Sequence, residues 1–165
     1  MASTYTPIAT TTLGSDTGIV TFSSISGSYT DLILVSKTAK NGGGAGTLRL
    51  QFNSDTGSNY SYVRMYANGT NAYSDASGSE TGAGVAILGD VAIASAGTFI
   101  VQLQNYSNSS TYKTAISRGS DSDGGYVSAY VSLWRSTSAI NRIDIYSTTN
   151  LRSGSTFTLY GIKAA

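Results

Sequence analysis

The 165-residue sequence contains no cysteine and no histidine. Without cysteine the chain forms neither disulfides nor thiolate metal sites, and without histidine it lacks the commonest general base and the commonest metal ligand. Proline occurs once, at Pro7, and charged residues make up only 12% of the chain. These absences exclude most familiar catalytic mechanisms, so the sequence predicts a protein that is not an enzyme, with no cofactor, no metal site and no catalytic residue.

The few charges nearly cancel. Ten Lys and Arg stand against nine Asp and Glu, which gives a formal net charge of +1. A chain this close to neutral offers no electrostatic attraction to a nucleic acid or an anionic membrane. No apolar run approaches the roughly 18 residues of a membrane span, and the N-terminus lacks the basic and apolar regions of a secretory signal. We therefore expect synthesis in a cytoplasm, and partners that are met by shape, backbone pairing and apolar contact.

Glycine, serine and threonine are abundant instead, which suits turns and hydroxyl-rich strands and suits long helices poorly. In many segments of the chain, apolar and polar side chains alternate with period two; two examples are residues 47–53 and 98–104. About ten such strands separated by turns predict an all-β sandwich, jelly roll or barrel with little or no helix. The length fits a single domain over residues 1–165. Residues 1–13 are interpreted as an extended N-terminal arm or an edge strand, because proline is tolerated at a sheet edge.

The segment 126–134 alternates with period two and belongs to the region 125–163, around which we expect the fold to be organised. Its predicted buried face carries Val127, Ala129, Val131 and Leu133. Its other face then presents an aromatic stripe of Tyr126, Tyr130 and Trp134. Such a stripe binds sugars by stacking or anchors a protein interface. The simpler alternative is that both faces are packed inside a sandwich or a subunit contact.

Residues 67–84 are mostly small and polar. A connection of this length without secondary structure is uncommon in a domain unless it has a function. We interpret it as an outward-facing loop that is mobile or contacts a partner.

Two acidic turns were considered as cation sites. Asp121 and Asp123 precede two glycines, and Asp55 lies between Asn53 and Asn59. Neither turn supplies the ligand set of a full calcium loop, so solvated turns are the favoured interpretation. Two carboxylates alone would suffice for a glycosidase, but the nine acidic residues are scattered and no pair stands out.

Several phrases of the sequence are similar to those of one known group of proteins. They are residues 5–13, 29–32, 50–60, 104–108 with 111–114, 133–137 with 139–141, and 154–162. Together they resemble virion structural proteins of tailed, cyanophage-like bacteriophages, in the group of capsid cement or decoration proteins. The similar phrases are strands and turns, so the resemblance concerns the fold and carries no catalytic signature.

The resemblance implies an antiparallel β-sandwich of jelly-roll type that forms a homotrimer. It further implies a structural virion protein that binds the major capsid protein on the phage head surface and stabilises contacts between its subunits. The capsid or subunit interface is expected to include Tyr5, Pro7, Ile8, Tyr126, Tyr130 and Trp134. The alternative function is a tail-fibre or receptor-binding module in which Tyr126, Tyr130 and Trp134 contact host surface glycans.

Overall fold

The computed structural model describes residues 4–42, 44–89, 92–121 and 125–163. It contains twelve strands and one short 3-10 helix, η1 (Ile93–Ser95). The strands are β1 (Tyr5–Thr12), β2 (Thr17–Phe22), β3 (Asp31–Thr38), β4 (Gly46–Phe52), β5 (Tyr60–Ala67), β6 (Ala72–Glu80), β7 (Ala83–Leu88), β8 (Gly97–Gln104), β9 (Lys113–Ser120), β10 (Val127–Trp134), β11 (Ile143–Leu151) and β12 (Thr156–Ile162). Within the described residues, no helix is long and apolar enough to span a membrane.

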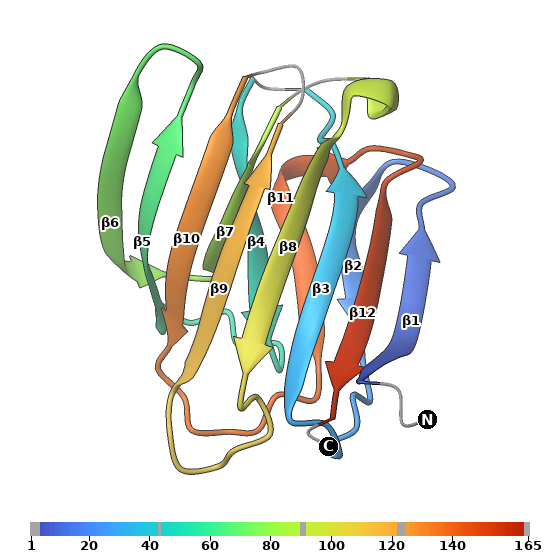
Figure 1. Cartoon of the computed structure of the whole chain (residues 1–165), viewed down its shortest axis with the longest axis vertical. Helices are drawn as coiled ribbons and strands as arrows, with labels where there is room; N and C mark the ends of the chain where they lie inside the picture. Colours follow the sequence, from blue (N-terminus) through green and yellow to red (C-terminus); the bar gives the residue numbers. More distant parts are fainter. Residues whose placement is uncertain (1–3, 43, 90–91, 122–124, 164–165) are drawn as a thin grey trace.

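The strands form two sheets packed face to face, with all neighbours antiparallel. The larger sheet has eight strands in the order β1-β12-β3-β8-β9-β10-β5-β6, and the smaller has four in the order β2-β11-β4-β7. Figure 1 shows the larger sheet as the near layer, with the smaller sheet behind part of it. The predicted all-β sandwich is confirmed, with twelve strands in place of about ten.

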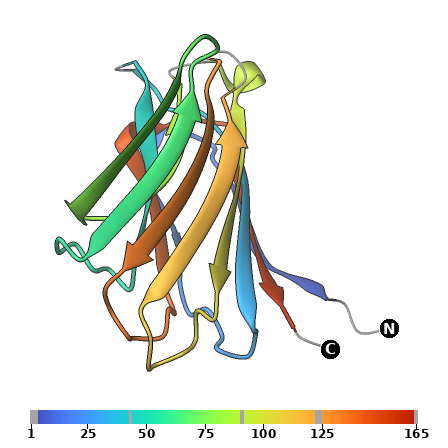
Figure 2. The ribbon, with the colours of Figure 1, turned by 60° about the vertical axis from the view of Figure 1, so that its left-hand side comes forward.

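Eight of the strands alternate between the sheets in a nested order. The strands β1-β12-β3-β8 lie in one layer and β2-β11-β4-β7 in the other, so the first strand pairs with the last and the second with the last but one. This order is compatible with a jelly roll. The remaining strands, β9, β10, β5 and β6, continue the larger sheet beyond β8, as the turned view in Figure 2 makes visible.

One hydrophobic cluster fills the space between the sheets. Leu34 from β3, Phe52 from β4 and Leu159 from β12 are among its fully buried members. Each such side chain contributes roughly 1.5–3 kcal/mol relative to remaining exposed. The strand β3 contains a continuous apolar run and lies in the interior of its sheet, between β12 and β8.

The strand β7 is the edge of the smaller sheet, and every one of its residues is buried. Its backbone approaches the larger sheet closely, because a Cβ on Gly84 would lie 3.1 Å from the ring of Tyr130. Ser117 Oγ donates to the carbonyl of Val85 over 2.6 Å, and Ser132 Oγ donates to that of Gly84 over 2.7 Å. Side chains of one sheet therefore satisfy edge carbonyls of the other and close the sandwich along β7.

The interpretation of residues 67–84 as a loop is wrong. The segment contains β6, which forms the outer edge of the larger sheet and pairs with β5, and it includes the start of β7. Cross-strand side chains hold β6 in register, since Tyr66 and Tyr73 lie opposite each other and stack at a ring distance of 5.0 Å. Most of β6 is exposed, which explains why its composition resembles that of a loop.

The N-terminal segment forms β1, an edge strand antiparallel to β12, as one of the two interpretations of residues 1–13 predicts. Pro7 lies opposite Tyr160, and the register shifts at Ile8, which has no partner residue in β12. This bulge lets Ile8 pack against the hydrophobic core while Tyr5 and Pro7 remain exposed. Their proposed contact with a capsid or another subunit stays a prediction.

Candidate functional site

The aromatic stripe faces the opposite way from the prediction. Tyr130 and Trp134 are only 1% and 2% exposed and lie on the inner face of β10, whereas Val127 and Val131 are each 53% exposed on the outer face. Alternation with period two fixes which residues share a face, but it does not say which face is covered. The rings are the larger apolar surface, and packing them inward buries more area than packing the valines would.

Asp55 anchors the buried end of this stripe. Trp134 Nε1 donates to the carboxylate of Asp55 over 2.7 Å, and Asn59 and the backbone of Gly57 donate to it as well. Burial opposes ionisation, but the hydrogen bonds from Trp134 and Asn59 outweigh it and lower the pKa of Asp55. The carboxylate is thus occupied by protein donors, which supports the solvated-turn interpretation over a cation site.

The second acidic turn lies partly outside the described residues, which include Asp121 but not Asp123. Over the described part of the chain, no group of three or more acidic, histidine or cysteine side chains is placed to hold a metal ion.

The buried lysines and the ion pairs hold loops and strands in place. Lys113 is almost fully buried, and its Nζ donates to the carbonyls of Thr111 and Thr137 over 2.6 and 3.1 Å. Burial lowers the pKa of Lys113. The Nζ of Lys40, also buried, donates to the carbonyl of Gly42. The hydrogen bonds of these buried amines to backbone carbonyls stabilise the turns, which is a structural role.

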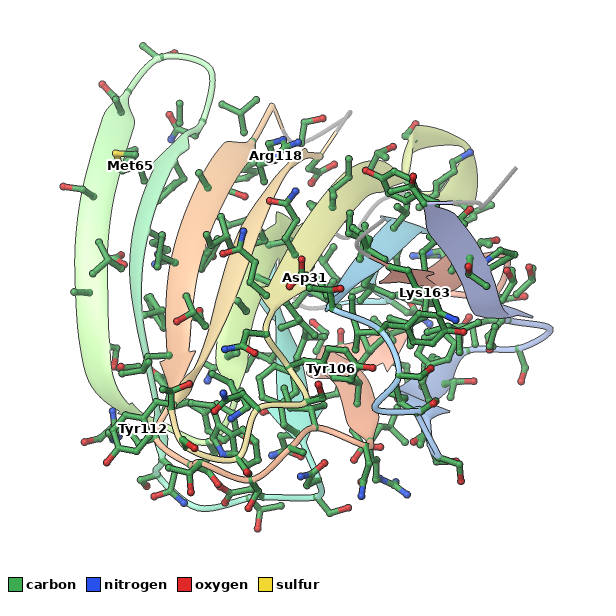
Figure 3. The ribbon with its side chains drawn as sticks, turned by 60° about the horizontal axis from the view of Figure 1, so that its bottom comes forward. Asp31, Met65, Tyr106, Tyr112, Arg118 and Lys163 are labelled. Atoms are coloured by element: carbon green, nitrogen blue, oxygen red, sulfur yellow. The ribbon has the colours of Figure 1, made fainter. Side chains whose placement is uncertain are left out.

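The outer face of the larger sheet carries an exposed apolar surface. The register places Val63, Val131 and Ile116 in one row across β5, β10 and β9. The neighbouring row carries Met65, which is 64% exposed, and Arg118. Figure 3 labels Met65 and Arg118, which come from β5 and β9 on either side of β10. We call this surface the outer apolar face; it comprises Val63, Met65, Ile116, Val127, Ala129 and Val131.

The outer apolar face is hollowed and carries little charge. A depression of about 820 Å³ runs across β5, β6, β8, β9 and β10, lined by side chains that include Met65, Ile100 and Val127. Arg118 is the charged residue of its lining. Contiguous apolar patches larger than a few hundred Å² are rare on monomeric proteins, and the largest patch on a protein surface is often functional. The sequence shows that Val127 and Val131 share one face of segment 126–134, but it does not show that this face is the exposed one.

The inner face of β5 and β6 carries a second cluster, which we call the Arg64 cluster: Tyr62, Arg64, Tyr66, Tyr73, Asp75 and Tyr130. Arg64 donates from Nε and Nη2 to the two carboxylate oxygens of Asp75, both over 2.7 Å, and from Nη1 to the hydroxyl of Tyr130 over 3.1 Å. Its guanidinium lies 4.8 Å from the ring centre of Tyr66. The carboxylate of Asp75 raises the pKa of Arg64, and Arg64 lowers that of Asp75.

A hollow of about 270 Å³ adjoins the Arg64 cluster. Its lining includes Thr47 from β4, Ile87 from β7, Arg64 and Tyr66 from β5, and Tyr126. Tyr126 is half-buried, so it is the member of the predicted aromatic stripe that keeps an accessible side chain. Arg64 and Tyr73 are not among the residues predicted from the sequence, because they come together only through the pairing of β5 with β6.

The structure defines an all-β sandwich on which two surfaces stand out, the outer apolar face and the Arg64 cluster. No protein-family model matches the chain, and no curated protein is similar to it. Among solved structures, the alginate lyase Aly36B in complex with alginate trisaccharide shares 10% identity over 93% of this chain and 78% of its own, with a TM-score of 0.37. Aly36B alone shares 11% identity over 93% of this chain and 77% of its own, with a TM-score of 0.33. A variant of Aly36B in complex with alginate tetrasaccharide shares 12% identity over 94% of this chain and 80% of its own, with a TM-score of 0.29. Likenesses this weak carry no inference about activity.

Proposed function

We propose that the protein is a structural virion protein, a capsid cement or decoration protein that binds the outside of a phage head. The observation that supports this best is the outer apolar face, where valine and methionine side chains stand exposed on a broad sheet. An apolar, nearly uncharged sheet face is suited to packing against another protein. The resemblance of the strand and turn phrases to phage cement proteins supports the same function.

The proposed mechanism is mass action on the assembled shell. The outer surface of the five strands β5, β6, β8, β9 and β10 measures roughly 24 by 24 Å, at about 4.8 Å spacing between strands and about 3.4 Å rise over seven residues, and the outer apolar face on β5, β9 and β10 is its centre. With the added relief of its side chains, this approaches the roughly 800 Å² that each partner contributes to a standard stable interface. Bound across a seam between major capsid subunits, the protein stabilises the assembled state relative to the ruptured one. A homotrimer of the protein would contact several seams between capsid subunits at once, and so bind the shell more tightly than a single chain.

Cryo-electron microscopy of the parent particle tests the location. Density for this chain on the head surface, with strands β5, β6, β9 and β10 facing major capsid subunits, is the expected result. Density confined to the tail tip, with a bare head surface, would refute the cement function and favour the receptor-binding alternative.

The receptor-binding alternative needs different contact residues from those predicted. Tyr130 and Trp134 are buried in the sandwich, so neither ring can stack on a glycan in the folded chain. Tyr126 remains accessible beside the Arg64 cluster. That cluster is therefore the surface on which glycan recognition can be examined.

A further inference from the structure

We propose that the Arg64 cluster and its adjoining hollow form a binding site for a neutral saccharide. The site lies on the inner face of the larger sheet, where β5 and β6 extend beyond the smaller sheet (Figure 1). Its residues are distinct from those of the outer apolar face, although Tyr66 and Tyr73 also line the depression beside that face; the proposal does not rest on the attachment to a capsid.

The Arg64 cluster contains an aromatic platform that is held in a fixed orientation. Tyr66 and Tyr73 stack with ring planes inclined by 20°, and Arg64 lies against Tyr66. Tyr73 is 41% exposed, although it sits on the inner face of its strand. A flat apolar ring with an accessible side, fixed by stacking before any ligand arrives, is the kind of surface on which the C–H face of a sugar ring packs.

Hydrogen-bonding groups of Arg64 and Asp75 lie beside this platform. The two hydrogen bonds between Arg64 and Asp75 leave outward-facing acceptor positions on the carboxylate, whose side chain is 41% exposed. Arg64 also keeps N–H groups beyond the three used for Asp75 and Tyr130. Donors and acceptors fixed a few ångströms apart match a pair of neighbouring sugar hydroxyls.

The charge of the site selects the ligand class. Arg64 is already neutralised by Asp75, and the other residues that line the hollow carry no charge. An anionic ligand would face the carboxylate of Asp75 without an unpaired cation to offset it. This argues for neutral sugars over uronates, phosphorylated glycans or nucleic acid.

The hollow sets the extent of the site. Its volume of about 270 Å³ is slightly below the roughly 300–1,000 Å³ that is usual for ligand pockets. Such a space suits one sugar unit between Tyr126 and Thr47, with a further unit lying over the exposed ring of Tyr73. The ligand is therefore a short oligosaccharide or the end of a longer chain.

The test is retention of the purified, full-length protein on a printed array of neutral and acidic oligosaccharides, followed by calorimetry with the best neutral one. We expect retention on neutral glycans and at least a tenfold loss of affinity in Tyr73→Ala. The matched control is Tyr112→Ala, because Tyr112 is comparably exposed but lies in the β8–β9 connection, outside the cluster. Asp75→Ala frees the Arg64 guanidinium and should shift retention toward acidic glycans.

Three outcomes would overturn the proposal: no retention of any oligosaccharide, retention of acidic ones alone, or equal affinity in Tyr73→Ala and the unaltered protein. The far-UV circular dichroism of each variant confirms that it is folded. A Val131→Lys variant should bind glycans normally, since Val131 is on the opposite face of the sheet. Failure of the saccharide site and failure of the capsid attachment are thereby measured separately.

Discussion

Ser132 illustrates how one small side chain connects the two sheets. Its hydroxyl donates to the buried carbonyl of Gly84 on the edge strand β7. Ser132→Ala leaves that carbonyl without the donor, so we expect the free energy of unfolding to fall by about 1–3 kcal/mol. Urea denaturation followed by Trp134 fluorescence measures the difference. Ser74→Ala, at an exposed position of β6, should change it by less than about 0.5 kcal/mol; a similar loss in both variants would contradict the role of Ser132.

Asp55 makes the stability depend on acid. Its folded pKa is lowered from the ordinary value, so its contribution is fully present above the unfolded pKa of about 3.9. It is lost as the pH falls through the lower folded value, because protons then bind the unfolded state preferentially. We expect the free energy of unfolding to decline below about pH 4, and to decline less steeply in Asp55→Asn. Denaturant titrations at pH 3 and pH 6 compare the two slopes, and equal slopes would mean that other carboxylates account for the effect.

The alternation in segment 126–134 was sufficient to group its side chains but not to orient them. Val131 and Tyr130 are neighbours with opposite exposure, and both residue types are common on buried and on interface surfaces. The orientation is decided by β7, which packs against the face of β10 that carries Tyr130. The carbonyls of β7 accept hydrogen bonds from Ser117 and Ser132. That contact joins residues far apart in the sequence, so no local pattern contains it.

Among the strands, those with a buried and a solvent-facing side were predicted well, and the exposed edge strand β6 was not. The strands β8 and β9 are alternating segments joined by a turn, a sequence pattern typical of the hairpin that they form. The strand β6 has no such pattern, because its composition suits a loop and its structure depends on pairing with β5. The Arg64 cluster was missed for the same reason, since Tyr73 and Asp75 belong to β6.

Because β6 is an exposed edge strand, it should be the least protected strand of the larger sheet. Its pairing involves β5 on one side, and few of its side chains are buried. We expect amides of β6 to exchange with deuterium at least tenfold faster than those of β3, which lies in the interior of the sheet beside the hydrophobic core. Hydrogen exchange read by mass spectrometry resolves the two segments. Comparable protection would show that β6 is covered in solution, for instance by another copy of the chain.

At the scale of the whole molecule, the larger sheet separates two chemically different surfaces. The outer apolar face offers valine and methionine side chains, whereas the inner face of β5 and β6 offers tyrosines and an ion pair. The four strands that extend the larger sheet beyond β8 contribute to both surfaces, because the eight-stranded sheet is wider than the four-stranded sheet can cover. A protein attached by its outer face would thus be free to present the inner cluster to a ligand.

The cement function predicts a specific loss when the outer apolar face is altered. Val131→Lys places a charge in the centre of that face, and burying an unpaired ammonium against a capsid costs several kcal/mol. We expect purified heads lacking the protein to regain resistance to rupture when the unaltered chain is added back, but not with Val131→Lys. Thr148→Lys is the control, since Thr148 is an exposed residue of β11 in the smaller sheet, away from the outer apolar face and from β1. Rupture temperature, followed by release of packaged DNA, is the measurement, and heads equally protected by both variants would place the capsid contact elsewhere on the molecule.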